Sequence, residues 1–139
     1  MPMTPPPVIG TLEAALYADD LSAAEAFYHG RLGLRVLTRD PKRHVFFQVP
    51  GSVLLVFKAS ATEQTRPEAH LPIPVHGGRG PGHYCFAVAA DQMEAWRTYL
   101  DTERIPVEAD FHWPNGARSI YIRDPAGNSV EFADPALWT

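Results

Sequence analysis

The stretch DDLSAAEAFYHGRLG, residues 19–33, is the first clear helix in the sequence, and the segments around it decide the fold. Asp20, or Ser22 together with Glu25, can cap the first turn of this helix, and Gly33 suits its C-terminal end. One strand-like run precedes the helix and three follow it, which predicts a βαβββ unit. The apolar side of the helix comprises Leu21, Ala24, Phe27, Tyr28 and Leu32, and the strand-like runs are residues 11–18, 34–39, 44–49 and 52–58.

The second half of the chain repeats this order. GHYCFAVA (82–89) is strand-like, and DQMEAWRTYLDTER (91–104) is a helical pattern with Asp91 as the expected N-cap. Three strand-like runs follow, so the chain is an internal duplication and the fold class is α+β. The buried side of the second helix comprises Met93, Trp96 and Leu100, and the later strand-like runs are residues 107–112, 117–123 and 129–133.

The length of 139 residues fits one domain. We expect a proline-rich arm at residues 1–9, a first module at 10–58, a linker loop at 59–81 and a second module at 82–135. Within the second module, the turn at 124–128 has the residue types of a tight connection, and we expect Asn128 to serve that turn.

Composition excludes several classes of function. The net charge of −4 and the absence of a basic run argue against a nucleic-acid partner. No apolar run approaches the ~20 residues of a membrane span. The single cysteine, Cys85, fits a reducing, cytoplasmic location. Since apolar residues surround it, we expect Cys85 to be a small core residue and not a nucleophile.

Polar residues occur at equivalent points of the two repeats. Glu13 on the first strand and His83 on the fifth are 70 positions apart. Leu55 on the fourth strand corresponds to Glu131 on the eighth. Because side chains alternate between the faces of a strand, each of the polar residues shares its face with small residues, while bulky apolar residues point the other way. This pattern is typical of a cavity lining.

The set Glu13, His83 and Glu131 has the chemistry of a metal site. Two carboxylates and an imidazole on one face would repel or stay unpaired unless a proton or a divalent cation lay between them. Three protein ligands with open positions are the arrangement of a catalytic metal centre, and the oxygen-rich set favours Fe²⁺, Mn²⁺, Zn²⁺, Ni²⁺ or Co²⁺ over copper. Ser119 and Tyr121 share one face of the strand paired with Glu131 and are predicted to project toward the same space.

Three segments of the sequence resemble the vicinal oxygen chelate superfamily, which includes glyoxalase I, extradiol dioxygenases, fosfomycin-resistance enzymes and bleomycin-resistance proteins. The resemblance covers residues 10–135. It implies two βαβββ modules that form a curved, cavity-enclosing mixed sheet with helices outside, and a homodimer. The segments are ALYADDLSAAEAFYHGRLGLRVL (15–37), GPGHYCFAV (80–88) and RSIYIRDPAGNSVEF (118–132).

In this superfamily the metal ligands come from the first, fourth, fifth and eighth strands. Carried over by motif, those positions fall on Glu13, Leu55, His83 and Glu131. Leu55 cannot coordinate, so three ligands remain. Relatives with three ligands usually have a histidine where this chain has Glu13. Tyr121 matches a tyrosine that often lies near the metal.

The leading hypothesis is a metal-dependent enzyme that acts on a small substrate with two adjacent oxygens, with chemistry like that of a ring-cleaving dioxygenase or a glyoxalase-type lyase. Glu131 and Tyr121 are its candidate catalytic residues. The alternative is a metal-free protein that binds a small molecule, as bleomycin-resistance proteins do. The two modules can pair within one chain or across two, and in the second case Glu13 would join His83 and Glu131 of the other subunit. Candidate substrate contacts are His76, Arg79, Ser119 and Trp113, whereas His29, His44 and His70 are expected at the surface.

Overall fold

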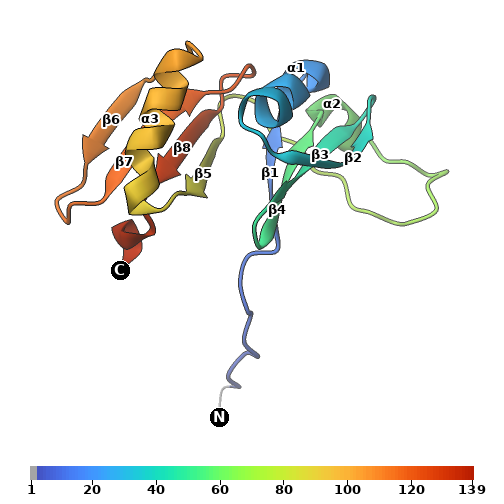
Figure 1. Ribbon diagram of the computed structural model, residues 1–139. Coiled ribbons are helices and arrows are strands. Elements are labelled where there is room, and N and C mark those ends of the chain that lie inside the picture. Colours follow the sequence, from blue (N-terminus) through green and yellow to red (C-terminus); the bar gives the residue numbers. More distant parts are fainter. Residues whose placement is uncertain (1–2) are drawn as a thin grey trace.

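The computed structural model describes residues 3–139 and contains the two predicted modules in sequence (Figure 1). The first two residues of the predicted arm lie outside this range. The first module comprises β1 (Glu13–Tyr17), α1 (Leu21–Glu25), η1 (Ala26–Arg31), β2 (Arg35–Asp40), β3 (His44–Val49) and β4 (Ser52–Phe57). The second comprises β5 (His83–Ala87), η2 (Ala90–Gln92), α3 (Met93–Thr102), β6 (Ala109–His112), β7 (Arg118–Arg123) and β8 (Ser129–Ala133), and it is followed by η3 (Pro135–Trp138).

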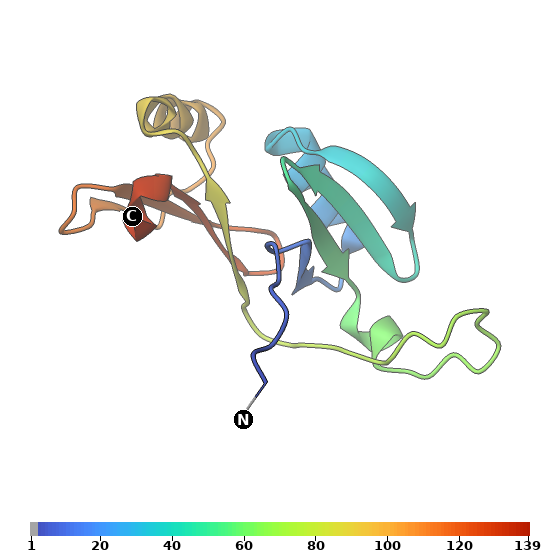
Figure 2. The ribbon, with the colours of Figure 1, turned by 90° about the horizontal axis from the view of Figure 1, so that it is seen from below.

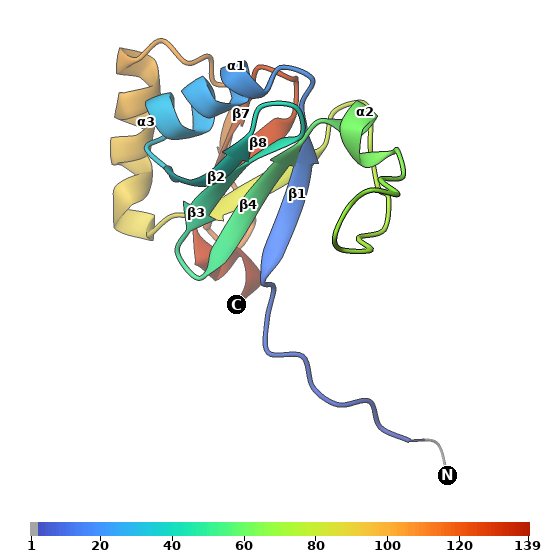
Figure 3. The same cartoon turned by 90° about the vertical axis from the view of Figure 1, so that its right-hand side faces the viewer.

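Each module forms a four-stranded mixed sheet. The strand orders are β1-β4-β3-β2 and β5-β8-β7-β6, in which the first and last strands of each module pair in parallel. Figure 3 shows the first sheet with its strands side by side. The predicted α+β fold of two βαβββ modules is confirmed. Within this chain the two sheets are separate, since no strand of one pairs with a strand of the other among the described residues.

The strand registers confirm which residues of the two modules are equivalent. Ala15 on β1 lies opposite Leu55 on β4, and Cys85 on β5 lies opposite Glu131 on β8. Ala15 and Cys85 follow Glu13 and His83 by the same two residues. Leu55 and Glu131 therefore occupy the same place in their respective sheets, as the sequence predicted.

The first helix begins and ends as its sequence predicts. The Asp20 carboxylate accepts a hydrogen bond from the Ala23 N–H at 2.9 Å, which caps α1. The helix continues as the π-helical segment η1, and Gly33 follows it with a φ of 79°, a conformation that favours glycine. The predicted apolar side is buried.

The second helix departs from the prediction at its start. A 3₁₀ turn, η2, precedes α3, and Asp91 lies inside that turn, so the predicted N-cap at Asp91 is wrong. The buried side is as expected: Met93 and Leu100 are buried, and the Trp96 ring stacks on Phe132 with centroids 4.5 Å apart.

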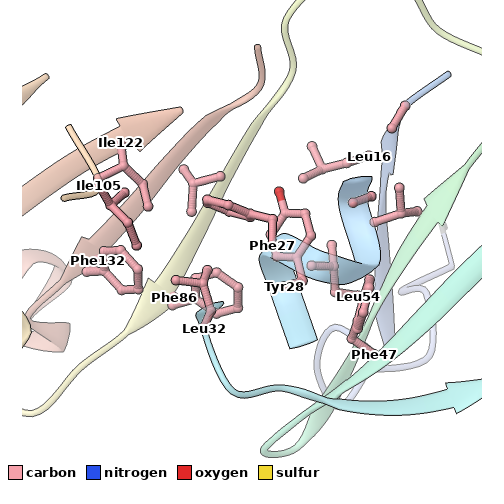
Figure 4. Packing of buried hydrophobic residues seen from close by; sticks show 14 of the residues in the cluster. Leu16, Phe27, Tyr28, Leu32, Phe47, Leu54, Phe86, Ile105, Ile122 and Phe132 are labelled. Atoms are coloured by element: carbon pink, nitrogen blue, oxygen red, sulfur yellow. The ribbon is translucent and has the colours of Figure 1, made fainter. Parts of the chain in front are cut away.

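One hydrophobic core joins the modules. The helix of the first module lies between the two sheets, and Figure 4 shows Phe27 and Tyr28 between Leu54 on one side and Phe86 on the other. Two polar contacts, one buried and one part-buried, cross the same boundary. The Tyr28 hydroxyl donates to Asp124 at 2.7 Å, and the Asn128 amide donates to the Tyr17 carbonyl at 3.1 Å. Asn128 thus serves its own turn, as predicted, and also ties that turn to β1.

The linker projects beyond the first sheet (Figures 1 and 2). Its first residues form a short helix, α2 (Ala59–Thr62), which the sequence did not predict. Leu71 and Ile73 in the linker are exposed. In residues 3–139, no helix is long and apolar enough to cross a membrane.

Candidate metal centre

The second sheet has one side covered by helices and one open side. On β5, Phe86 is buried toward the core, whereas His83 and Cys85 are exposed on the open side. Glu131 on β8 lies opposite both Cys85 and Tyr121. Strand alternation therefore gathers the predicted polar residues of this module on one face.

Glu131 is the buried acid of this face, with 5% of its surface exposed. Its Oε2 accepts a hydrogen bond from the Ser119 hydroxyl at 2.6 Å, and its Oε1 lies 3.2 Å from Nε2 of His83. A buried carboxylate needs such partners, because burial without them would cost several kcal/mol.

The orientation of His83 is set by its other ring nitrogen. Nδ1 lies 3.1 Å from the carbonyl oxygen of Ser129 and 3.2 Å from the Ser129 hydroxyl. A carbonyl oxygen only accepts, so the contact assigns a proton to Nδ1. In the neutral ring, Nε2 then presents a lone pair to Glu131. A lone pair and a carboxylate oxygen at this distance require a proton or a cation between them.

This geometry fits two ligands of one metal ion. Two donor atoms that each lie about 2.1 Å from an ion, at roughly a right angle, are about 3 Å apart. A histidine ligand that donates its second ring N–H to a carbonyl is also the usual arrangement around metals in proteins. His83 and Glu131 therefore fit a divalent cation as a pair.

Glu13 does not join this pair within one chain. It lies on β1, an edge strand of the first sheet, and its side chain is exposed. Among residues 3–139, no three His, Cys, Asp or Glu side chains are grouped so that they could hold a metal ion. A single chain supplies two of the three predicted ligands at one place.

Tyr121 and Cys85 flank the pair. The Tyr121 ring stacks near His83, with centroids 6.1 Å apart. Burial, with the nearby Glu131 carboxylate, raises the pKa of Tyr121, so its phenol stays protonated and can donate a hydrogen bond.

Cys85 is exposed and not a core residue, which corrects the sequence prediction. The apolar neighbours of Cys85 in the sequence suggested burial, but no helix covers the face of the sheet to which its side chain points. Partial burial of the thiol and the charge of Glu131 raise the pKa of Cys85 to about 12. The thiol is therefore protonated at neutral pH, which supports the expectation that it is not a nucleophile.

The four predicted substrate contacts fall in two places. Ser119 and Trp113 belong to the second module, where the Trp113 indole N–H donates to the Ser119 hydroxyl at 2.8 Å. His76 lies against the first sheet, with Nδ1 at 2.7 Å from the Tyr17 hydroxyl, and Arg79 pairs with Glu63 in the linker at 2.8 Å.

Sequence reasoning gave no role to Ser129 and misplaced His44. Ser129 shares a face with Glu131, which was the available signal, but its contact with His83 depends on the parallel register of β5 and β8. His44, predicted at the surface, is half-buried and stacks on Phe46 with centroids 4.1 Å apart. Burial lowers the pKa of His44, and its Nδ1 has no hydrogen-bond partner within the described part of the chain.

Comparison with known proteins agrees with this architecture. Residues 10–132 match the family model of the glyoxalase/bleomycin resistance protein/dioxygenase superfamily. The chain belongs to this superfamily. None of the curated proteins matches the chain significantly.

Among solved structures, a lactoylglutathione lyase from Agrobacterium tumefaciens is 44% identical, with 96% of this chain and 98% of that chain covered and a TM-score of 0.91. A superfamily member from Nocardioides is 22% identical, with 95% and 85% covered and a TM-score of 0.70. A glyoxalase/dioxygenase from Nostoc punctiforme is 23% identical, with 97% of each chain covered and a TM-score of 0.66. The last two share the fold with this chain.

Proposed function

We propose that the protein is a divalent-metal-dependent enzyme of the lyase or isomerase type, acting on a small substrate with two adjacent oxygens. The observation that carries the proposal is the pair formed by His83 and Glu131, whose facing atoms are 3.2 Å apart while Nδ1 of His83 is held by Ser129. The likeness to a lactoylglutathione lyase favours this reaction type over ring cleavage with oxygen.

Glu13 completes the ligand set from a second subunit in this proposal. Its sheet and the sheet of His83 are separate within the chain, and both carry open faces. A homodimer in which the open face of one subunit's first sheet meets the open face of the partner's second sheet would supply all three donors. Closed two-fold dimers are the commonest form of soluble oligomer, and such a dimer would contain two equivalent sites.

The residues of the chain have distinct roles in this mechanism. A divalent ion held by His83, Glu131 and the partner subunit's Glu13 would supply Lewis-acid stabilisation of negative charge on the substrate oxygens. Glu131 would detach from the ion to take the proton that leaves one substrate carbon and would return that proton to the neighbouring carbon, so atoms and charge balance over the cycle. Tyr121, whose raised pKa keeps its phenol protonated, donates a hydrogen bond to a substrate oxygen. The single cysteine fits a reducing compartment, so we place the enzyme in the cytoplasm.

The first test is metal content. The protein, purified without chelator and then reconstituted separately with Fe²⁺, Mn²⁺, Zn²⁺, Ni²⁺ and Co²⁺, is expected to hold one ion per subunit with at least one of these metals. The loaded protein is then assayed for formation of lactoylglutathione by absorbance and for oxygen uptake with catechols. Stoichiometric metal with oxygen uptake alone would replace the lyase by a dioxygenase.

Absence of stoichiometric metal under all five conditions would overturn the proposal. It would favour the second candidate, a metal-free small-molecule binding protein. That candidate is favoured by one observation: within residues 3–139, no three His, Cys, Asp or Glu side chains are grouped so that they could hold a metal ion.

The shared site has its own test. Glu13→Ala and His83→Ala homodimers are each expected to be inactive. When the two variants are unfolded and refolded together, a mixed dimer would contain one intact site, so activity should return to about a quarter of the wild-type level. Failure of the mixture to regain activity would place all ligands within one chain or exclude Glu13.

A further inference from the structure

The Glu131 carboxylate accepts a hydrogen bond from the Ser119 hydroxyl, and this hydroxyl in turn accepts a hydrogen bond from Trp113. The Trp113 indole N–H donates to Ser119 Oγ at 2.8 Å, and Ser119 Oγ donates to Glu131 Oε2 at 2.6 Å. An indole N–H can only donate, and a serine hydroxyl has a single proton. The contact with Trp113 therefore occupies a lone pair of Ser119 and leaves its proton for the carboxylate.

We infer that Trp113 and Ser119 are positioning residues that form a hydrogen-bond chain holding the Glu131 carboxylate in the orientation required of a metal ligand. This inference rests on the proposed function. It replaces the expectation that the two residues contact substrate. Ser119 has no exposed surface, which suits an internal contact better than a contact with a bound molecule.

The chain of hydrogen bonds is anchored where β6 turns into β7. The backbone N–H of Trp113 donates to the Ala117 carbonyl at 2.8 Å, and the backbone N–H of Gly116 donates to the Trp113 carbonyl at 2.8 Å. The Phe111 ring packs edge-on against Trp113, with centroids 4.9 Å apart. These contacts fix the indole, and the indole fixes the serine rotamer.

The first module folds without such a chain. In the strand registers, Ser119 lies opposite Ala133 on β8, and the equivalent position on β3 is His44, opposite Phe57 on β4. The position equivalent to Glu131 is Leu55. The βαβββ fold therefore does not require these polar side chains, and they occur only in the module that contains the buried carboxylate.

The oxygen that remains for a cation is consequently defined. With Oε2 bonded to Ser119, Oε1 is the atom that faces Nε2 of His83. Loss of the serine hydroxyl would let the carboxylate rotate and would leave Oε2 buried without a donor. Outer-shell partners of this kind typically change metal affinity by about 10- to 100-fold.

Co²⁺ titration followed by visible absorbance tests the inference, because the spectrum reports both affinity and ligand geometry. Ser119→Ala is expected to weaken Co²⁺ binding by about 10- to 100-fold and to alter the spectrum. Trp113→Phe should weaken it less. The double variant should match Ser119→Ala alone, because Trp113 acts through the serine. Ser119→Thr, which keeps the hydroxyl, should restore affinity to within about threefold of wild type.

Two controls separate the possible failures. Thr62→Val removes another buried hydroxyl, in α2 of the linker, and should lower stability without changing the Co²⁺ spectrum. Glu131→Gln should abolish binding. Should the wild-type protein and Glu131→Gln bind Co²⁺ alike, the proposed function fails. Should Glu131→Gln lose binding while both Ser119→Ala and Trp113→Phe retain wild-type affinity and spectrum, the positioning role alone fails.

Discussion

The open faces of the two sheets carry different side chains at equivalent positions. In the first sheet, Leu55 on β4 lies opposite Phe46 on β3. In the second, Glu131 on β8 lies opposite Tyr121 on β7. The helix-facing sides are alike, since Leu54 and Val130 are both fully buried and apolar.

This difference separates the demands of folding from those of chemistry. Burial against a helix requires apolar residues on one side of each sheet, whatever the module does. The open side is under no such demand, and among the described residues only the second module brings a buried carboxylate, an imidazole and a serine hydroxyl into contact there. Substitutions at equivalent positions should therefore have different effects in the two modules.

The largest expected effect is on metal affinity, which should depend on Glu131 and not on its equivalent in the first module, Leu55. Glu131→Gln should weaken divalent-metal binding by more than about 100-fold, since removing a ligand costs more than removing an outer-shell partner. Leu55→Met, which conserves volume and polarity, should leave the affinity unchanged. Calorimetric titration with the metal found in the protein measures both. Equal losses in the two variants would mean that the effect is structural.

Substitutions in the turns before the last strand of each module should also differ in how much stability they cost. Asn128→Ala removes the amide that accepts from the Gly82 N–H and donates to the Tyr17 carbonyl, and we expect a loss of about 3 kcal/mol. Gly51→Ala, at a φ of 75° in the turn of the first module, should cost about 1–2 kcal/mol. Urea unfolding monitored by circular dichroism gives both values. A larger loss at Gly51 would contradict the structural role given to Asn128.

Ion pairs link the outer strand to the helix in each module. Hydrogen bonds from Arg118 lower the pKa of Asp110. Burial of the carboxyl partly opposes this effect, and a hydrogen bond from Arg97 adds to it. Because the folded pKa lies below the unfolded one, this stabilisation is present above about pH 4 and is lost as the pH falls through the folded pKa. Asp110→Asn should cost about 1–2 kcal/mol at pH 7.

That cost should shrink toward zero on acidification below about pH 4. The more exposed pair of the first module, Glu25 with Arg39, should matter less, and Glu25→Gln should cost no more than about 0.5 kcal/mol. Urea unfolding at a series of pH values measures these differences. A pH-independent difference at Asp110 would show that charge is not its cause.

The smallest effect concerns Cys85. Because its pKa is raised to about 12, alkylation by iodoacetamide at pH 8 should be slow even though the residue is exposed. Glu131→Gln removes one cause of the raised pKa but not the larger one, burial of the thiol, so the rate should rise only a few-fold. Mass spectrometry of the modified protein follows the reaction. An unchanged rate would mean that Glu131 does not influence the thiol.

Much of the fold could be predicted because its signals are local. Apolar periodicity located the helices of the two modules and the eight strands within residues 3–139, and the repeat offset paired Leu55 with Glu131. Asp91 and residues 59–62 were mistaken because short 3₁₀ and helical turns depend on the path of the neighbouring chain and not on a distinctive pattern. Cys85 was misplaced because an apolar strand looks the same whether or not its second face is covered.

The candidate site could be predicted in part. Alternation and the repeat brought His83, Glu131, Ser119 and Tyr121 to one face, as the structure has them. The bond from Trp113 to Ser119 depends on the rotamer of a residue at the end of β6, and no sequence pattern specifies it. The role of Glu13 stays a prediction, since it depends on a partner that one sequence does not describe.

The position of the first helix between the two sheets has a consequence for folding cooperativity. Phe27 and Tyr28 belong to the first module by sequence, yet they pack in one cluster with Phe86 and Phe132 of the second. Cutting the chain in the linker would expose this cluster on both fragments. Although the sequence is a duplication, we therefore expect that neither half folds alone and that the protein unfolds in one step.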